Sequence, residues 1–161
     1  MARPRDPSER VFELTGCFGV RLDPSRRDEL QAFYQGCADY FELVTGQPPG
    51  PNEAEELLSS LPRGKSLEDK FVIGLFDAPG HLIGVLDVIR DYPKRGEWFL
   101  GLLMFGPTWR GRRLGERVYH RLEEQLGRRL SLREVIACEM ETITAPLEQV
   151  VDWLLGVVRV R

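Results

Sequence analysis

The chain has no long apolar run and few cysteines, and each of these shortages excludes a class of protein. No apolar stretch reaches the roughly 18 residues that a membrane-spanning helix needs; the longest candidates, residues 98–105 and 150–158, are of strand or short-helix length. The first ten residues are polar and charged, so they do not form a secretory signal. The three cysteines lie far apart without Cys-x-x-Cys pairing, which argues against a zinc site or a disulfide framework. We therefore expect a cytoplasmic protein with no membrane partner and no metal site.

Internal repeats and low-complexity linkers are also absent, and a length of 161 residues suits one compact domain.

The net charge is −3 and the isoelectric point is near 5.5, whereas nucleic-acid-binding domains are usually basic overall. Arginines are nevertheless concentrated in residues 110–133, while residues 53–69 are acidic. We interpret the arginine cluster as a local anion site and expect no nucleic-acid partner. A solvated basic helix face is the alternative interpretation.

The first half of the chain predicts one strand followed by two helices. Residues 11–22 alternate loosely and predict an opening strand, and Ser25 is placed to cap the helix that follows. Proline and glycine in residues 47–51 interrupt the chain, and Asn52 is expected to cap a short second helix over 53–61. The apolar stripe of the first helix has steps of three and four residues: Leu30, Phe33, Cys37, Phe41 and Val44.

The second half predicts a strand meander, a helix and three further elements. Residues 70–76 and 81–89 predict a β-hairpin around a turn that contains Pro79 and Gly80, and residues 97–105 predict a third strand. Apolar residues four apart predict a core-facing helix from Leu114 to Leu126. A strand over 133–140, a helix over 147–155 and a short strand over 157–160 complete the order β-α-α-β-β-β-α-β-α-β. This order predicts a mixed α/β fold around one sheet.

The segment between the third meander strand and the next helix has the features of a phosphate site. A strand that enters a short glycine-containing loop at a helix start presents free backbone N–H groups, and the helix dipole adds about half a positive charge. Pyrophosphate binds to such a place without a catalytic side chain. Gly111 and Gly115 lack a Cβ atom, so the backbone can approach a ligand closely, and neighbouring arginines can bind phosphate oxygens.

The same segment resembles the GNAT acetyltransferases, which have Arg/Gln-x-x-Gly-x-Gly/Ala after their fourth strand. That strand is commonly of the Gly-Leu-Leu-Leu type and is followed by proline and an aromatic residue. The matching residues here are Gly101, Leu102, Leu103, Met104, Pro107, Trp109, Arg110, Gly111, Leu114 and Gly115. The middle glycine of the motif is Arg113 in this chain, and we expect its side chain to project outward, away from the dense cations of the loop.

The resemblance covers roughly residues 11–130 and implies a single GNAT-like domain over 11–161 after a flexible N-terminus (residues 1–10). It implies a central, mixed but mostly antiparallel sheet flanked by helices, with acetyl-CoA as acyl donor. The family reaction is direct transfer of the acetyl group to a primary amine, here of an unidentified small-molecule or peptide acceptor. The resemblance leaves both a monomer and a homodimer as alternatives. By the same analogy Leu103, Met104 and Phe105 would pair their backbone with the pantetheine arm. The pyrophosphate would be held by the remaining residues of the loop: Arg110, Gly111, Arg112, Arg113, Leu114 and Gly115.

Candidates for the general base are few. Glu97 opens the strand that leads to the cofactor site, where relatives often have a base acting through water; an exposed strand-end carboxylate is the alternative. Asp87, in the apolar strand 81–89, is the second candidate, while His81 and His120 are expected at the surface. Many relatives also have an acidic tyrosine near the C-terminus. All four tyrosines of this chain come earlier, at or before Tyr119. A non-catalytic acyl-CoA-binding or regulatory module on the same fold therefore remains an alternative to an enzyme. An anion- or nucleic-acid-binding domain that uses the arginine-rich helix remains a third.

Overall fold

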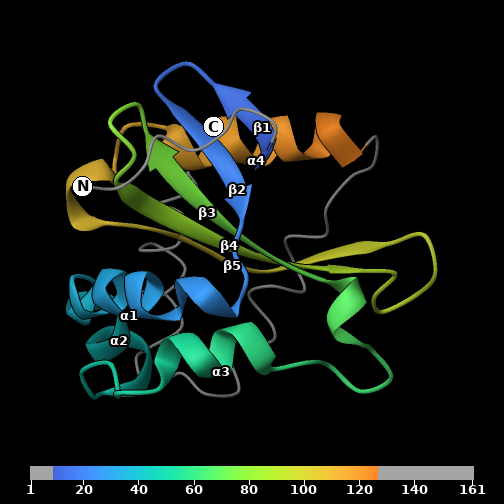
Figure 1. Ribbon diagram of the computed structural model, residues 1–161, viewed down its shortest axis with the longest axis horizontal. Helices are drawn as coiled ribbons and strands as arrows, with labels where there is room; N and C mark the ends of the chain where they lie inside the picture. Colours follow the sequence, from blue (N-terminus) through green and yellow to red (C-terminus); the bar gives the residue numbers. More distant parts are fainter. Residues whose placement is uncertain (1–8, 127–161) are drawn as a thin grey trace.

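The computed structural model describes residues 9–126, which form one antiparallel sheet with helices on both faces (Figure 1). The five strands lie in the order β1-β2-β3-β4-β5, and each neighbouring pair is antiparallel. Three short 3-10 helices (η) accompany the main elements. In chain order these are β1 (Arg10–Leu14), β2 (Cys17–Arg21), η2 (Pro24–Arg26), α1 (Arg27–Gln35), α2 (Ala38–Thr45), α3 (Glu53–Ser59), η3 (Leu67–Asp69), β3 (Lys70–Asp77), β4 (Leu82–Arg90), β5 (Trp98–Phe105), η4 (Pro107–Trp109) and α4 (Leu114–Leu126).

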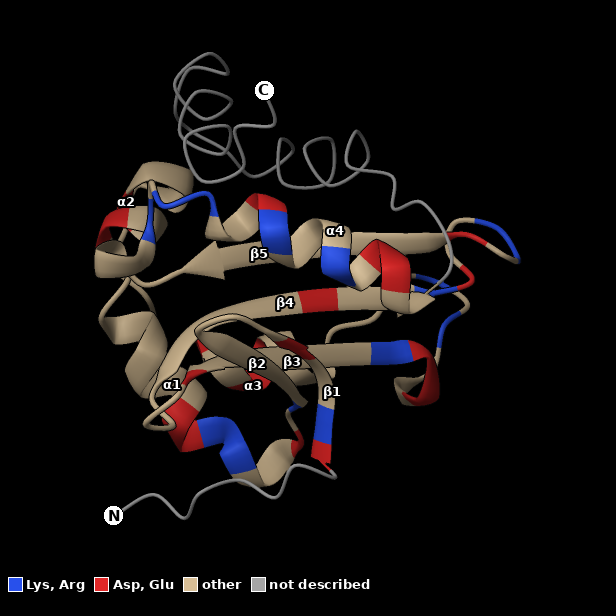
Figure 2. Cartoon of the chain, turned by 90° about the horizontal axis from the view of Figure 1, so that it is seen from above, with Lys and Arg blue, Asp and Glu red and all other residues tan. Residues whose placement is uncertain are grey.

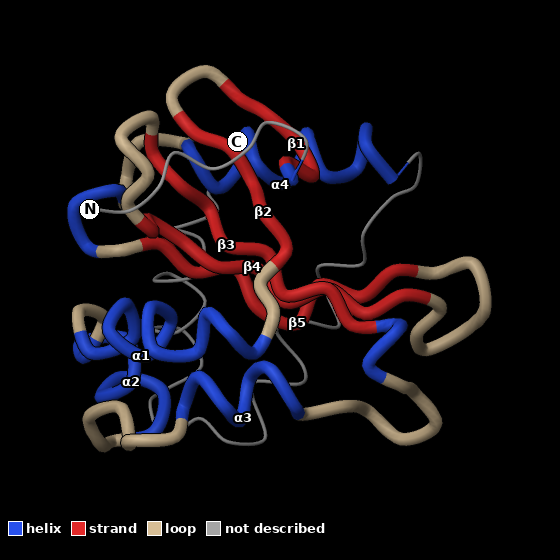
Figure 3. Tube along the Cα trace, in the orientation of Figure 1, coloured by secondary structure: helices blue, strands red, loops and turns tan. Residues whose placement is uncertain are grey.

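The sheet separates two apolar layers. On one face α4 packs its buried residues, among them Val118 and Leu122, against residues of β4 and β5 such as Leu86 and Leu103. On the other face α1, α2 and α3 pack together (Figure 3), and residues such as Leu30 contact the opposite sides of the same strands. Strands with both faces buried are expected to be nearly continuously apolar, as β4 and β5 are.

Two predicted elements are divided in the structure. The opening strand predicted over 11–22 is a hairpin of β1 and β2, because Gly16 takes a φ of +93° in the turn between them. The first helix is divided into α1 and α2 at Gly36 and Cys37. Its apolar stripe still contacts the sheet, because Leu30 of α1, Cys37 at the break and Val44 of α2 all belong to the same buried layer.

The meander and the helix after it are confirmed almost to the residue. The hairpin turn has a hydrogen bond from the Gly80 N–H to the Asp77 carbonyl at 2.9 Å, with Gly80 at a φ of +95°. The expected side-chain caps differ: Ser25 donates its own N–H to the Asp23 side chain at 2.7 Å, and the Asn52 side chain makes no capping hydrogen bond.

The three C-terminal elements predicted over 133–160 lie outside the described residues, as do Cys138 and most of the predicted N-terminal segment. The part of the chain that the structure does describe contains no helix long and apolar enough to cross a membrane.

Candidate active site

The predicted phosphate loop connects β5 to α4. Gly111 has a φ of +74°, and a Cβ atom built on it would meet nothing within 4 Å, so there is room beside this part of the backbone. The N–H groups of Gly111, Arg112 and Arg113 find no backbone acceptor within residues 9–126. The first α4 N–H groups, those of Leu114 and Gly115, have no intrahelical partner by geometry. The loop thus has the free donors and the open space that a phosphate group requires.

Arg110 links this loop to the opposite side of the sheet. Its Nε donates to the Phe105 carbonyl at 2.9 Å, and its guanidinium forms an ion pair with Asp39 of α2. Figure 2 shows the basic segment before α4 lying next to α2. Burial alone would raise the pKa of Asp39, but the hydrogen bond and charge of Arg110 outweigh it and hold that pKa below its usual range. Arg110 therefore fixes the loop in place, a role that the sequence did not indicate.

The side chains of Arg112 and Arg113 are less constrained than that of Arg110. Both are exposed, and the Arg112 guanidinium lies over the Trp109 ring, 5.2 Å from its centroid. Arg113 projects outward as predicted, and its φ of +57° is in the left-handed region that favours glycine. The backbone at this position therefore has the conformation that explains a glycine in the motif. The two exposed cations flank the free N–H groups of the loop.

The remaining predicted cofactor residues are buried. Leu103 and Phe105 belong to the layer under α4, Met104 to the layer under α1 and α2, and Leu114 and Gly115 are covered at the start of α4. Within the described residues β5 is an edge strand, so every second backbone N–H and C=O group points away from β4. These residues can contact a ligand through their backbone, as the resemblance implies.

A bulge interrupts β5 at Gly101. Val88 pairs with Leu100 and Asp87 pairs with Leu102, so Gly101 is an extra residue without a partner on β4. A Cβ atom on Gly101 would lie 3.6 Å from Oδ2 of Asp87. The bulge therefore brings unpaired backbone next to the Asp87 carboxylate, and nothing in the sequence indicated it beyond the glycine itself.

Asp87 forms a buried ion pair with Lys70. The Lys70 Nζ donates to Asp87 Oδ2 at 2.9 Å, and the two side chains are only 3% and 13% exposed. The other oxygen, Oδ1, is buried and has no hydrogen-bond partner within residues 9–126. Burial raises the pKa of Asp87, and the charge of Lys70 offsets this only in part. Asp87 thus combines a raised pKa with one carboxylate oxygen that no described residue binds.

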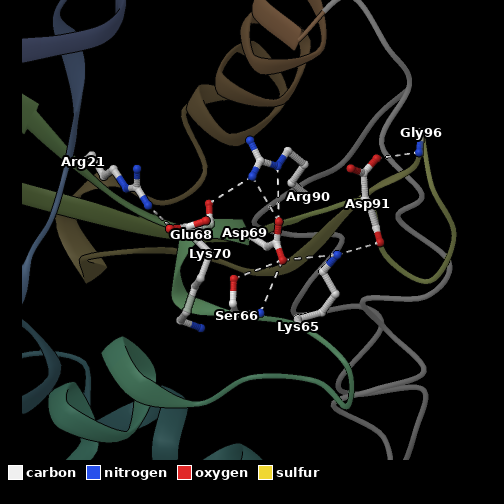
Figure 4. A network of polar contacts seen from close by, with 9 residues as sticks. All are labelled: Arg21, Lys65, Ser66, Glu68, Asp69, Lys70, Arg90, Asp91 and Gly96. Atoms are coloured by element: carbon white, nitrogen blue, oxygen red, sulfur yellow. Dashed lines mark hydrogen bonds and ion pairs between the residues drawn. The ribbon is translucent and has the colours of Figure 1, made fainter.

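A polar network holds Lys70 in position (Figure 4). Arg21 donates to the Lys70 carbonyl at 2.7 Å, and the neighbouring Asp69 accepts hydrogen bonds from Arg90 at 3.1 and 3.3 Å. The Lys70 side chain itself points away from this network (Figure 4), toward Asp87. The network ties the start of β3 to the end of β4, and so fixes the backbone on both sides of the ion pair.

Glu97 is the predicted base that the structure does not bring to this centre. It lies in the β4–β5 turn, its side chain is 45% exposed, and its nearest cation is Lys94 at 3.7 Å. It lines neither of the pockets beside Asp87. The alternative interpretation, an exposed strand-end carboxylate, fits Glu97 better. Asp87, the second candidate, has the surroundings expected of a base.

Two adjoining pockets meet at Asp87 and Ser60, on the sheet face covered by α1, α2 and α3. The larger has a volume of about 410 Å³, and we call it the acceptor pocket; the smaller, of about 260 Å³, also contains Lys70 and Phe99. The lining of the acceptor pocket comprises Tyr34, Tyr40, Phe41, Glu53, Glu56, Leu57, Ser60, Asp87, Gly101, Leu102 and Met104.

Within residues 9–126 no group of three His, Cys, Asp or Glu side chains could hold a metal ion.

Comparison with known proteins agrees with this architecture. An acetyltransferase from Thermus thermophilus has a similar structure, with a TM-score of 0.61 and 21% identity over 75% of each chain. A GCN5-related N-acetyltransferase from Brucella melitensis has a TM-score of 0.53 and 19% identity, over 74% of this chain and 55% of that one. No curated protein sequence matches. The model of the acetyltransferase (GNAT) family matches residues 19–145, which is most of the chain, and the chain therefore belongs to the GNAT acetyltransferase family.

Proposed function

We propose that this protein transfers the acetyl group of acetyl-CoA directly to a primary amine, with Asp87 as the base. The observation that supports this most is the Asp87 carboxylate, which lines the acceptor pocket beside the β5 bulge: its Oδ2 lies 3.6 Å from a Cβ atom built on Gly101, and its buried Oδ1 has no hydrogen-bond partner within residues 9–126. The same strand leads from that bulge into the phosphate loop. The donor and the acceptor would therefore meet at the bulge of β5, from opposite sides.

The phosphate loop fits the pyrophosphate of acetyl-CoA. Its free N–H groups and the start of α4 supply hydrogen bonds and a positive potential, and Arg112 and Arg113 add exposed cations. The outer edge of β5 offers backbone groups to the amide-containing pantetheine arm. Binding there would direct the thioester toward Gly101.

The chemistry requires a neutral amine, because an ammonium ion has no lone pair with which to attack. The acceptor would transfer a proton to the Asp87 carboxylate, whose raised pKa brings it closer to the working pH than an ordinary carboxylate. The amine nitrogen would then form a bond to the thioester carbon, and an N–H of the bulge would stabilise the negative charge on the carbonyl oxygen. Collapse of the intermediate breaks the carbon–sulfur bond, and the nitrogen loses its excess proton to solvent. The proton held on Asp87 would pass to the leaving sulfur, which departs as the coenzyme thiol and leaves Asp87 as a carboxylate again.

The test is a thiol-release assay with acetyl-CoA and a panel of amines, comparing the wild type with Asp87→Asn and Glu97→Gln. We expect Asp87→Asn to lower kcat by about 10²-fold or more, the scale of general base catalysis, while Glu97→Gln changes it less than twofold. Acetyl-CoA binding measured by calorimetry is the control for folding, and should be similar in all three proteins. If acetyl-CoA binds but no amine is acetylated, the chain is the non-catalytic acyl-CoA-binding module instead. A silent Asp87→Asn would exclude Asp87 as the base.

A further inference from the structure

The acceptor pocket is more acidic than a site for an ordinary amine needs to be. Every charged side chain that lines it is a carboxylate: Glu53, Glu56 and Asp87. Lys70 compensates Asp87, as described above. No cation compensates the two glutamates within the described residues, and Glu53 only accepts a hydrogen bond from the Gly50 N–H at 3.1 Å. The wall of the pocket thus has negative charge in excess of what one reacting amine uses.

Acidic residues in the first turn of a helix also stabilise the helix itself, so the position of each glutamate on α3 matters. Glu55, in the same turn, lies outside the pocket and pairs with Arg27 at 3.5 Å. Glu53 and Glu56 are three residues apart, which puts them on one side of the helix, and both line the pocket. A helix-stabilising role alone would not require the two unpaired carboxylates to share the pocket face.

Aromatic side chains form another part of the pocket wall. Tyr34 and Phe41 pack edge to face with their ring centroids 5.1 Å apart, and Tyr40 and Phe41 do so at 5.3 Å. All three rings line the acceptor pocket. Aromatic faces attract cations and pack against methylene chains, so this wall suits a chain with positive groups and apolar segments between them.

We propose that the acceptor is a linear diamine or polyamine, whose first amine reacts at Asp87 while a second ammonium group lies against Glu53 and Glu56. This inference rests on the proposed function and names its substrate class. The pocket volume of about 410 Å³ leaves space for a chain beyond the reacting amine. An acceptor with a carboxylate in place of the second ammonium would face two glutamates and be repelled.

The experiment compares three amines of equal chain length in the acetyl-CoA assay: butylamine, 1,4-diaminobutane and 4-aminobutanoate. We expect kcat/KM for the diamine to be at least tenfold higher than for butylamine, and 4-aminobutanoate to be the poorest. Glu53→Gln/Glu56→Gln should lower the diamine's kcat/KM about tenfold, mainly through KM, and change butylamine less than twofold. Glu55→Gln, the matched control on the same helix turn, should leave all three rates unchanged.

A second readout separates this inference from the proposed function. Calorimetry measures diamine binding to the complex with coenzyme A, where no acetyl group can be transferred. Diamine binding that the double variant weakens, without turnover of any amine, would contradict the proposed function but would still identify a diamine as the ligand of this pocket. Equal rates with butylamine and the diamine, a diamine preference that persists in the double variant, or no diamine binding would each overturn the acceptor class.

Discussion

Removal of Lys70 should destabilise the fold by an amount that depends on pH. In Lys70→Met the side chain keeps most of its length but loses its charge, so the Asp87 carboxylate stays buried without a cation. Both side chains are almost fully inaccessible, at 3% and 13% exposed, so solvent screening cannot replace the lost partner. Breaking a buried ion pair from one side costs about 3–5 kcal/mol, and we expect about 3 kcal/mol near neutral pH.

The sign of the pH dependence follows from the raised pKa of Asp87. The folded state binds the carboxyl proton more tightly than the unfolded state, whose pKa is about 3.9. The stabilisation of the folded state that comes from this tighter proton binding is fully present below the unfolded pKa and is lost as the pH rises through the folded pKa. Loss of Lys70 raises the folded pKa further. The cost of Lys70→Met should therefore grow from acidic to neutral pH.

Urea unfolding at about pH 5 and about pH 7.5 measures this cost as the difference from the wild type. Lys94→Met is the control, because it removes an exposed pair with Glu97 and should cost less than about 1 kcal/mol. The double variant Lys70→Met/Asp87→Leu should recover much of the lost stability, since no buried charge remains. A cost below about 1 kcal/mol at both pH values, or one that does not change with pH, would refute the reasoning.

Three further predictions concern the phosphate loop and the cysteines. Arg113→Gly should raise the free energy of unfolding by about 1 kcal/mol in urea titrations, because glycine adopts the left-handed backbone conformation of this position without strain. The same change should alter acetyl-CoA affinity in calorimetry by at most about 1 kcal/mol. Arg112→Gly, at an exposed position outside the left-handed region, should not raise the free energy of unfolding. Gly115→Val should abolish acetyl-CoA binding in a protein whose circular dichroism is unchanged, and an affinity within threefold of wild type would show that the loop is not the site. Burial raises the pKa of the Cys37 thiol to about 11 and also raises that of Cys17, so neither should be alkylated by iodoacetamide near pH 8 until urea is added; modification of the native chain, detected by peptide mass spectrometry, would contradict this.

The phosphate loop could be predicted because everything it needs is contiguous in the chain. A strand, a turn with Gly111 and a helix start at Leu114 fix the position of the free N–H groups by local geometry alone. The β3–β4 hairpin could be predicted for the same reason, since its turn residues and its two apolar strands are neighbours in sequence. Even the outward direction of Arg113 followed from the local density of positive charge.

The choice between Asp87 and Glu97 could not be made in this way. Both are acids at predicted strand positions, and their sequence environments differ less than their structural ones. Asp87 is buried beside a bulge, whereas Glu97 is exposed in a turn. The contacts that distinguish them, with Lys70 and Gly101, come from segments 17 and 14 residues away that only the sheet register brings together.

The sequence alone therefore determined the family, the local elements and the phosphate loop, because short-range geometry and hydrophobic periodicity specify them. Tertiary structure decided which charged groups become partners: Arg110 finds Asp39 across 71 residues, and Glu53 and Glu56 meet Asp87 around one pocket. The physical reason is that the effect of a charge depends on its burial and its neighbours, and neither is a property of the residue or of its position in the chain.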